Sequence, residues 1–136
     1  MPAGDSGKPL FEKLGIREGY KVAALNAPAN YESLLWKMPA GVTVSQELAG
    51  KFDLVHLFVA DETNLQMQLK KSIGRIKPSG VIWVSWPKGK SRFKSCFGEN
   101  AVRTIGLKSG LVDVKICAVD ETWSGLKFVR RLKDRR

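Results

Sequence analysis

The chain has 136 residues, 43% of them hydrophobic, which is the size of one ordinary domain with one buried core. Its formal net charge is +10, but residues 1–68 hold 6 basic against 8 acidic side chains, and residues 69–136 hold 17 against 5. This asymmetry is compatible with a solvated basic face and with an anionic partner such as nucleic acid. No apolar stretch approaches the roughly 18 residues of a membrane span, and residues 1–8 do not resemble a signal peptide. We therefore expect a cytoplasmic protein without membrane contact.

Small and polar residues at 1–7 predict a flexible N-terminal tail. We expect a single Rossmann-like domain over residues 8–132 and a basic C-terminal tail at 133–136.

The first part of the domain predicts a short helical turn, a strand, a helix and a second short strand. The expected ranges are 9–14 for the turn, 20–25 for the strand, 30–38 for the helix and 42–45 for the second strand. Pro28 prevents the first strand from continuing, and Pro39 with Gly41 ends the helix.

The sequence from Leu54 to Val59 is apolar apart from His56, which is typical of a central strand covered on both faces. Leucine and isoleucine at helical spacing predict a helix from Asp61 to Ile76, stopped by a turn at Lys77–Gly80. The remaining expected elements are a strand at 81–86, a helix at 99–109, and two strands at 111–119 and 126–132 joined by a loop at 120–125. Strands alternating with helices, followed by this hairpin, predict an α/β fold. It should be a Rossmann-like three-layer sandwich with a mostly parallel sheet closed by a C-terminal antiparallel hairpin.

Several of these segments resemble known families. The first set is Leu14-Gly15-Ile16, Gly19-Tyr20-Lys21-Val22, Phe52-Asp53-Leu54-Val55 and Ile76-Lys77-Pro78-Ser79-Gly80. With the terminal hairpin, this set resembles the core of the class I S-adenosylmethionine-dependent methyltransferases, which implies an antiparallel last strand. The second set is Val55–Val59, Trp83–Lys88 and Val119–Lys127. This set resembles an uncharacterised bacterial family of unknown function, which implies no established activity.

Two features depart from the methyltransferase pattern. After the first strand, a glycine-rich turn is replaced by the segment from Asn26 to Tyr31, in which Ala27, Pro28 and Ala29 obstruct a close approach to the backbone. Only residues 27–51 separate the first and central strands, so about one strand and one helix of the family core are expected to be missing. We therefore expect no cofactor, with S-adenosylmethionine in an altered pose as the alternative. Glu47 is the candidate acidic residue for its ribose hydroxyls.

Ligands of open α/β sheets bind at the carboxyl ends of the parallel strands, and this rule defines a candidate binding site. The expected ligand-binding residues are Asn26, Tyr31, Trp86, Lys88, Asp120, Glu121 and Trp123. In this hypothesis the two tryptophans form stacking walls, Lys88 contacts an anion, and Asp120 or Glu121 acts as acceptor or base. The alternative is that both tryptophans pack under the hairpin, that Asp120 only fixes its turn and that Lys88 is solvated.

Other chemical groups carry weaker signals. A nucleic-acid surface is predicted from the basic residues Lys90, Arg92, Lys94, Arg130 and Arg131. Cys96 and Cys117 are interpreted as ordinary thiols, and no metal site is expected. His56, the only histidine, is interpreted as a core residue whose burial requires a hydrogen-bond partner.

The first functional interpretation is a non-catalytic binding or interaction module on a methyltransferase-like scaffold. One alternative is an enzyme or sensor that binds S-adenosylmethionine or a nucleotide. The other is a basic protein associated with nucleic acid. A shaped cavity at the strand ends would favour the enzyme or sensor. A filled edge together with a continuous positively charged face would favour the nucleic-acid-associated protein.

Overall fold

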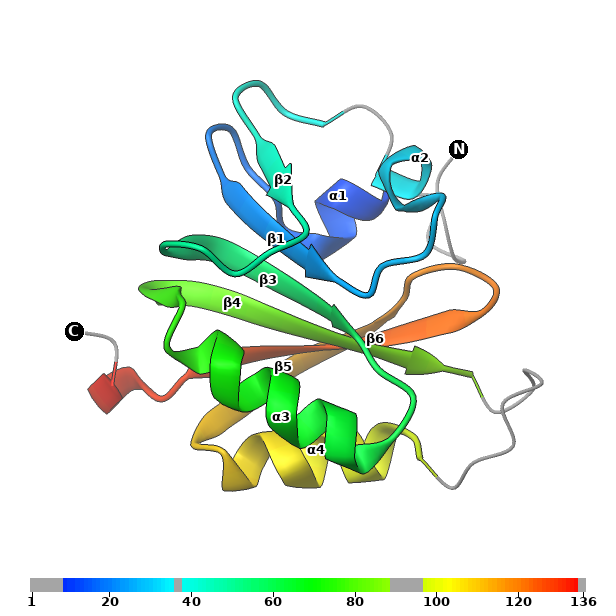
Figure 1. Ribbon diagram of the computed structural model, residues 1–136, viewed down its shortest axis with the longest axis vertical. Helices are drawn as coiled ribbons and strands as arrows, with labels where there is room; N and C mark the ends of the chain where they lie inside the picture. Colours follow the sequence, from blue (N-terminus) through cyan, green and yellow to red (C-terminus); the bar gives the residue numbers. More distant parts are fainter. Residues whose placement is uncertain (1–8, 36–37, 89–96, 135–136) are drawn as a thin grey trace.

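The computed structural model describes residues 9–35, 38–88 and 97–134, which form a six-stranded mixed sheet between two layers of helices (Figure 1). The elements are α1 (Leu10–Leu14), β1 (Lys21–Leu25), α2 (Tyr31–Leu35), β2 (Thr43–Ser45), β3 (Phe52–Phe58), α3 (Glu62–Ile73), β4 (Ile76–Pro87), α4 (Glu99–Lys108), β5 (Leu111–Ala118), β6 (Trp123–Arg130) and the 3₁₀ turn η1 (Leu132–Asp134). Within these ranges no helix is long and apolar enough to cross a membrane. The expected tail at 1–7 and the last two residues of the expected basic tail lie outside the described residues.

The strand order is β2-β1-β3-β4-β6-β5, in which the first four strands are parallel and β6 runs antiparallel to both of its neighbours. This confirms the predicted α/β sheet with its C-terminal antiparallel hairpin. Only α2 and β2 are described between β1 and β3, and β2 forms the outer edge beside β1. The shortening expected from the sequence therefore falls on this side of the sheet.

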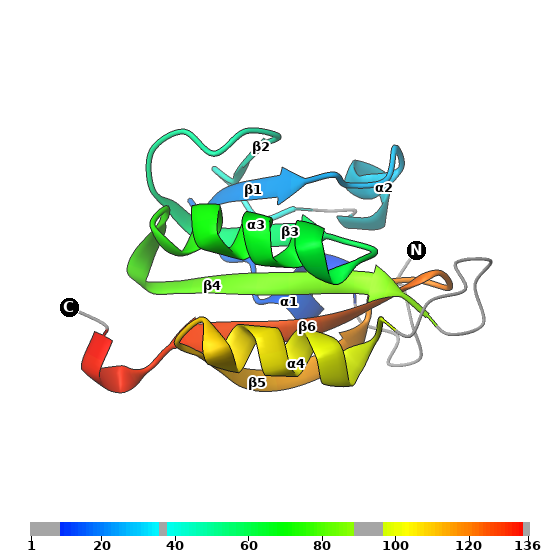
Figure 2. The same cartoon turned by 60° about the horizontal axis from the view of Figure 1, so that its bottom comes forward.

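Each face of the sheet is covered by its own pair of helices. Figure 2 shows α3 and α4 on the near face of the sheet, where they enclose a core that includes Leu65, Val102 and Phe128. On the opposite face α1 and α2 enclose a second core, and the indole Nε1 of Trp83 donates a hydrogen bond to the carbonyl of Leu14 at 3.0 Å. Because the central strand β3 contributes to both cores, its residues from Leu54 to Phe58 are all buried and, apart from His56, apolar, as the sequence predicts.

The predicted stop at Lys77–Gly80 is wrong, because these residues belong to β4. Helix α3 already ends at Ile73. The register of β4 on β3 shifts between Phe52, which pairs with Ile76, and Leu54, which pairs with Val81. Proline is tolerated inside a strand at such an irregularity, since no ladder hydrogen bond is required there. The Lys77 ammonium lies 3.0 Å from the Asp53 carboxylate and joins the two strands at this point.

The predicted hairpin loop at 120–125 is too long, because β6 begins at Trp123. One carboxylate oxygen of Asp120 accepts hydrogen bonds from the backbone amides of Thr122 and Trp123, both at 2.8 Å, and this closes a tight turn. Gly125 lies inside the strand, where a Cβ would stand 3.3 Å from the Ser85 hydroxyl and from the Trp83 ring. A glycine is therefore required at position 125 by the close packing between β4 and β6, and not by the turn.

Candidate functional site

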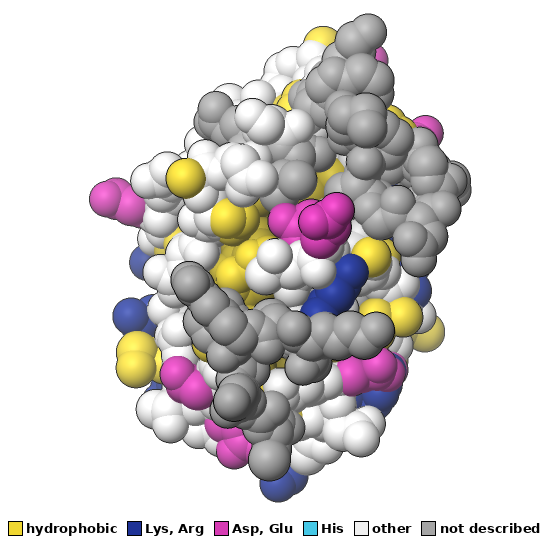
Figure 3. Space-filling view, turned by 90° about the vertical axis from the view of Figure 1, so that its right-hand side faces the viewer, with side chains coloured by type: hydrophobic (Ala, Val, Ile, Leu, Met, Phe, Trp, Pro, Cys, Tyr) yellow, Lys and Arg dark blue, Asp and Glu magenta, His cyan; other side chains and the backbone are white. Residues whose placement is uncertain are grey.

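The carboxyl ends of the parallel strands and the β5–β6 turn meet at one edge of the sheet. Pro87 pairs with Trp123, and the backbone amide of Lys88 donates a hydrogen bond to the carbonyl of Thr122 at 2.8 Å. In Figure 3, which faces this edge, hydrophobic side chains are visible in a hollow, with acidic and basic side chains beside it. The turn thus reaches the edge at which ligands of open α/β sheets bind.

A cavity of about 510 Å³ opens at the carboxyl ends of β1 and β2. It is lined by Ala24, Asn26, Ala27, Pro28, Ala29, Tyr31, Val44 and Gln46. Asn26 has a φ of 60°, the left-handed conformation for which glycine is usually selected and which asparagine tolerates. The segment after β1 therefore turns without a glycine, and its alanine and proline side chains form part of the cavity wall.

Tyr31 connects this cavity to a buried polar chain. Its hydroxyl lies 2.8 Å from Nδ1 of His56, and Nε2 of the same ring lies 2.7 Å from the hydroxyl of Ser85. His56 and Ser85 are fully buried, and Tyr31 is 4% exposed. A neutral imidazole has one donor and one acceptor nitrogen, so both of its hydrogen-bonding positions are used. This confirms the interpretation of His56 as a satisfied core residue.

Burial keeps the Tyr31 hydroxyl and the His56 imidazole in their neutral forms. Desolvation lowers the pKa of His56 to about 3 and raises the pKa of Tyr31 above its ordinary value. The Tyr31 ring also packs edge-on against His56 and against Phe58, with centroid distances of 5.4 and 5.5 Å. The wall of the cavity at Tyr31 is therefore rigid and uncharged.

The two tryptophans of the hypothesis lie on opposite faces of the sheet. Trp86 is 5% exposed and belongs to the core under α3 and α4. Trp123 is half-buried and packs edge-on against Phe58 at a centroid distance of 5.0 Å, on the side of α1 and α2. They cannot stack on the two sides of one ligand, and neither lines the cavity.

The charged residues proposed for the site occupy the turn rather than the cavity. Asp120 accepts two backbone hydrogen bonds through one oxygen, Glu121 is exposed, and Lys88 is half-buried beside the turn. Of the seven proposed residues, Asn26 and Tyr31 line the cavity, and the other five do not. A binding role for those five residues stays a prediction.

Sequence reasoning missed Ala24, Val44, Gln46 and Ser85. Gln46 directly follows β2, so the rule that selected the ends of the longer strands also selects it. Glu47, the candidate for the ribose hydroxyls, is exposed and its backbone amide donates to the Ser45 hydroxyl, whereas Gln46 lines the cavity.

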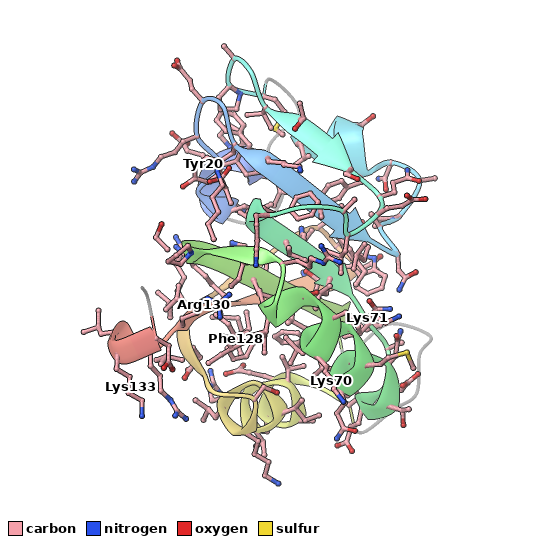
Figure 4. All side chains as sticks on the ribbon, turned by 60° about the vertical axis from the view of Figure 1, so that its left-hand side comes forward. Tyr20, Lys70, Lys71, Phe128, Arg130 and Lys133 are labelled. Atoms are coloured by element: carbon pink, nitrogen blue, oxygen red, sulfur yellow. The ribbon has the colours of Figure 1, made fainter. Side chains whose placement is uncertain are left out.

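Of the basic residues of the nucleic-acid hypothesis, the structure describes Arg130 and Arg131. The guanidinium of Arg130 donates hydrogen bonds to the carbonyls of Ile73 and Ile76, and Figure 4 shows this side chain between η1 and α3. Arg130 therefore fastens the end of α3 to β6, while Arg131 is exposed. Lys90, Arg92, Lys94 and the cysteine at position 96 lie outside the described residues.

Cys117 is half-buried, and this burial raises the pKa of its thiol. The described residues contain no group of three or more potential metal ligands among His, Cys, Asp and Glu.

No family model matches the chain, and no curated protein matches it. Its fold is similar to solved methyltransferase structures. A SAM-dependent methyltransferase from Aquifex aeolicus superimposes with a TM-score of 0.57 at 14% identity, covering 88% of this chain and 86% of that one. A fibrillarin pre-rRNA processing protein of Methanococcus jannaschii gives 0.59 at 11% identity, with coverages of 90% and 69%. The N-methyltransferase NodS from Bradyrhizobium japonicum WM9 gives 0.55 at 13%, with coverages of 82% and 86%.

At these identities the likeness concerns the fold alone. The chain therefore has a shortened, methyltransferase-like fold, with a cavity at the end of β1 and no glycine in the segment from Asn26 to Tyr31 that follows this strand.

Proposed function

We propose that this protein is a non-catalytic binding module that holds a nucleoside-type ligand in the cavity at the ends of β1 and β2. S-adenosylmethionine and its demethylated product are the first candidates. The observation that carries the proposal is the cavity itself. Its volume of about 510 Å³ falls in the range of about 300 to 1,000 Å³ that is usual for small-molecule sites.

The lining suits a neutral heteroaromatic ligand. Ala27, Pro28 and Ala29 offer an apolar surface for a flat ring, and the amides of Asn26 and Gln46 can both donate and accept hydrogen bonds. No carboxylate is among the described lining residues, so ribose hydroxyls would have to bind the Gln46 amide instead. A ligand must also lie farther from the backbone than a glycine turn would allow, because of the alanine Cβ atoms and the proline ring.

The non-catalytic part of the proposal rests on the state of the ionisable groups. Tyr31 is the only ionisable residue among the described lining residues, and its hydroxyl is engaged with His56 while burial raises its pKa. The carboxylate of Asp120 lies in the hairpin turn, where one of its oxygens accepts two backbone hydrogen bonds, and it does not line the cavity. Neither group is available as a general base beside the cavity.

Calorimetric titration with S-adenosylmethionine, its demethylated product, adenosine and ATP tests the binding. Ala29→Trp should fill the cavity and weaken binding by at least about tenfold, which corresponds to a loss of about 1.4 kcal/mol. Ala49→Trp is the matched control, since Ala49 is exposed and does not line the cavity. The absence of binding to all four ligands at millimolar concentration would refute the proposal. Transfer of a labelled methyl group from S-adenosylmethionine to an acceptor would refute its non-catalytic part.

A further inference from the structure

Two lysines lie directly opposite each other on neighbouring strands. Lys115 of β5 pairs with Lys127 of β6 in the antiparallel ladder. Side chains at such positions are close neighbours, and like charges there destabilise a sheet. The repulsion between the two ammonium groups therefore lowers the stability of the sheet, and a bound anion would offset it.

Both lysines lie on the α1 side of the sheet. Leu126 and Phe128, which flank Lys127 in β6, point into the core under α3 and α4, so Lys127 points to the other face. There its partner on β4 is Trp83, which belongs to the core under α1. Lys115 is exposed and Lys127 is half-buried.

A third cation comes from the segment after α1. Leu14, the last residue of α1, accepts a hydrogen bond from the indole of Trp83, which pairs with Lys127 in the β4–β6 ladder, so the segment after α1 begins beside Lys127. In agreement with this placement, burial lowers the pKa of Lys127, and the positive charges of Lys115 and Arg17 lower it further. Arg17 is exposed. Within the described parts of the chain, none of these three side chains forms an ion pair; the ion pairs there belong to Lys77 and Arg103.

We propose that Arg17, Lys115 and Lys127 form a binding site for a phosphate group on the α1 side of the β5–β6 hairpin. A guanidinium presents a planar fork of donors to phosphate oxygens, and two ammonium groups add the positive charge that a doubly charged phosphate requires. This site is separate from the cavity at the carboxyl ends of β1 and β2. The phosphate belongs either to a small molecule or to a nucleic-acid backbone, which would be consistent with the positive charge of the second half of the chain.

Titrations at low ionic strength with inorganic pyrophosphate and with a 12-base-pair duplex distinguish the two sources. Binding of pyrophosphate assigns a small phosphorylated ligand, and binding of the duplex alone assigns a nucleic acid; either supports the site. Arg17→Gln and Lys127→Gln should each weaken binding about tenfold or more. Lys71→Gln is the matched control, because Lys71 is an exposed lysine on α3, on the other face of the sheet (Figure 4). Binding of neither probe, or an equal loss in the control, would overturn the proposal.

A second measurement needs no ligand. If the lysine pair repels, Lys115→Gln should raise the midpoint of thermal unfolding at 10 mM salt relative to Lys71→Gln, and the gain should shrink at 200 mM salt because salt screens the repulsion. A midpoint below that of Lys71→Gln at 10 mM salt would contradict the charge cluster on which the site depends.

Discussion

Replacing His56 with glutamine should remove a large part of the acid sensitivity of the protein. His56 is fully buried, and its pKa is about 3 in the folded chain, against about 6.5 in the unfolded chain. Between these values the unfolded state binds a proton that the folded state excludes, so the free energy of unfolding falls as the pH is lowered. The stability contribution is complete above pH 6.5 and is lost progressively towards pH 3.

The expected size follows from 1.36 kcal/mol per pKa unit. Lowering the pH from 7.5 to 5.0 should reduce the free energy of unfolding by about 2 kcal/mol, since about 1.5 units of the shift are used in that interval. Asp and Glu side chains titrate mainly below this window, and His56 is the only histidine, so few other groups contribute. Urea unfolding at pH 5.0, 6.0, 7.0 and 7.5 measures the slope for the natural chain and for His56→Gln. The variant should be nearly independent of pH over this range, and an unchanged slope would refute the assignment of a neutral buried imidazole.

Three further substitutions test the packing. Gly106→Ala should lower the free energy of unfolding, measured in urea, by about 1 to 3 kcal/mol, because the new Cβ would overlap the buried Phe128 ring. Gly74→Ala is the control and should leave this free energy unchanged, since its Cβ would meet nothing within 4 Å. Equal effects of the two substitutions would contradict this packing. Asp61→Ala should cost about 1 kcal/mol in the same assay, since its carboxylate caps α3 through the Asn64 amide at 2.7 Å, and a neutral effect would contradict the cap. Asp120→Ala should lower the free energy of unfolding by about 1 kcal/mol or more, because it removes the two hydrogen bonds to backbone amides that close the hairpin. Asp120→Asn should retain part of this stability. An alanine variant as stable as the natural chain would show that the turn does not depend on this side chain.

The order and type of the elements could be predicted because each strand and helix has a local signal. The apolar run around His56 required a strand covered on both faces, and the helical spacing of Leu65 and Leu69 required α3. Boundaries failed where tertiary contacts override local preference. Pro78 resembles a stop, but the register shift opposite Asp53 accommodates it within β4, and Gly125 resembles a turn residue although it is needed for contact with Trp83.

The position of the candidate site was predictable, but most of its residues were not. The segment from Asn26 to Tyr31 follows a strand, so topology alone places it at the binding edge. Topology does not say which face a side chain takes at that edge. Trp86 and Trp123 are both at the edge, yet the alternation of side chains along their strands sends them to different cores.

Chemical-shift mapping tests the central proposal most directly. The backbone amides of the ¹⁵N-labelled protein are followed while S-adenosylmethionine or its demethylated product is added. We expect saturable shifts concentrated at Asn26, Ala27, Ala29, Tyr31 and Gln46, which line the cavity. Saturable shifts confined to other parts of the chain, or no saturable shift with either ligand, would contradict a nucleoside site at the ends of β1 and β2.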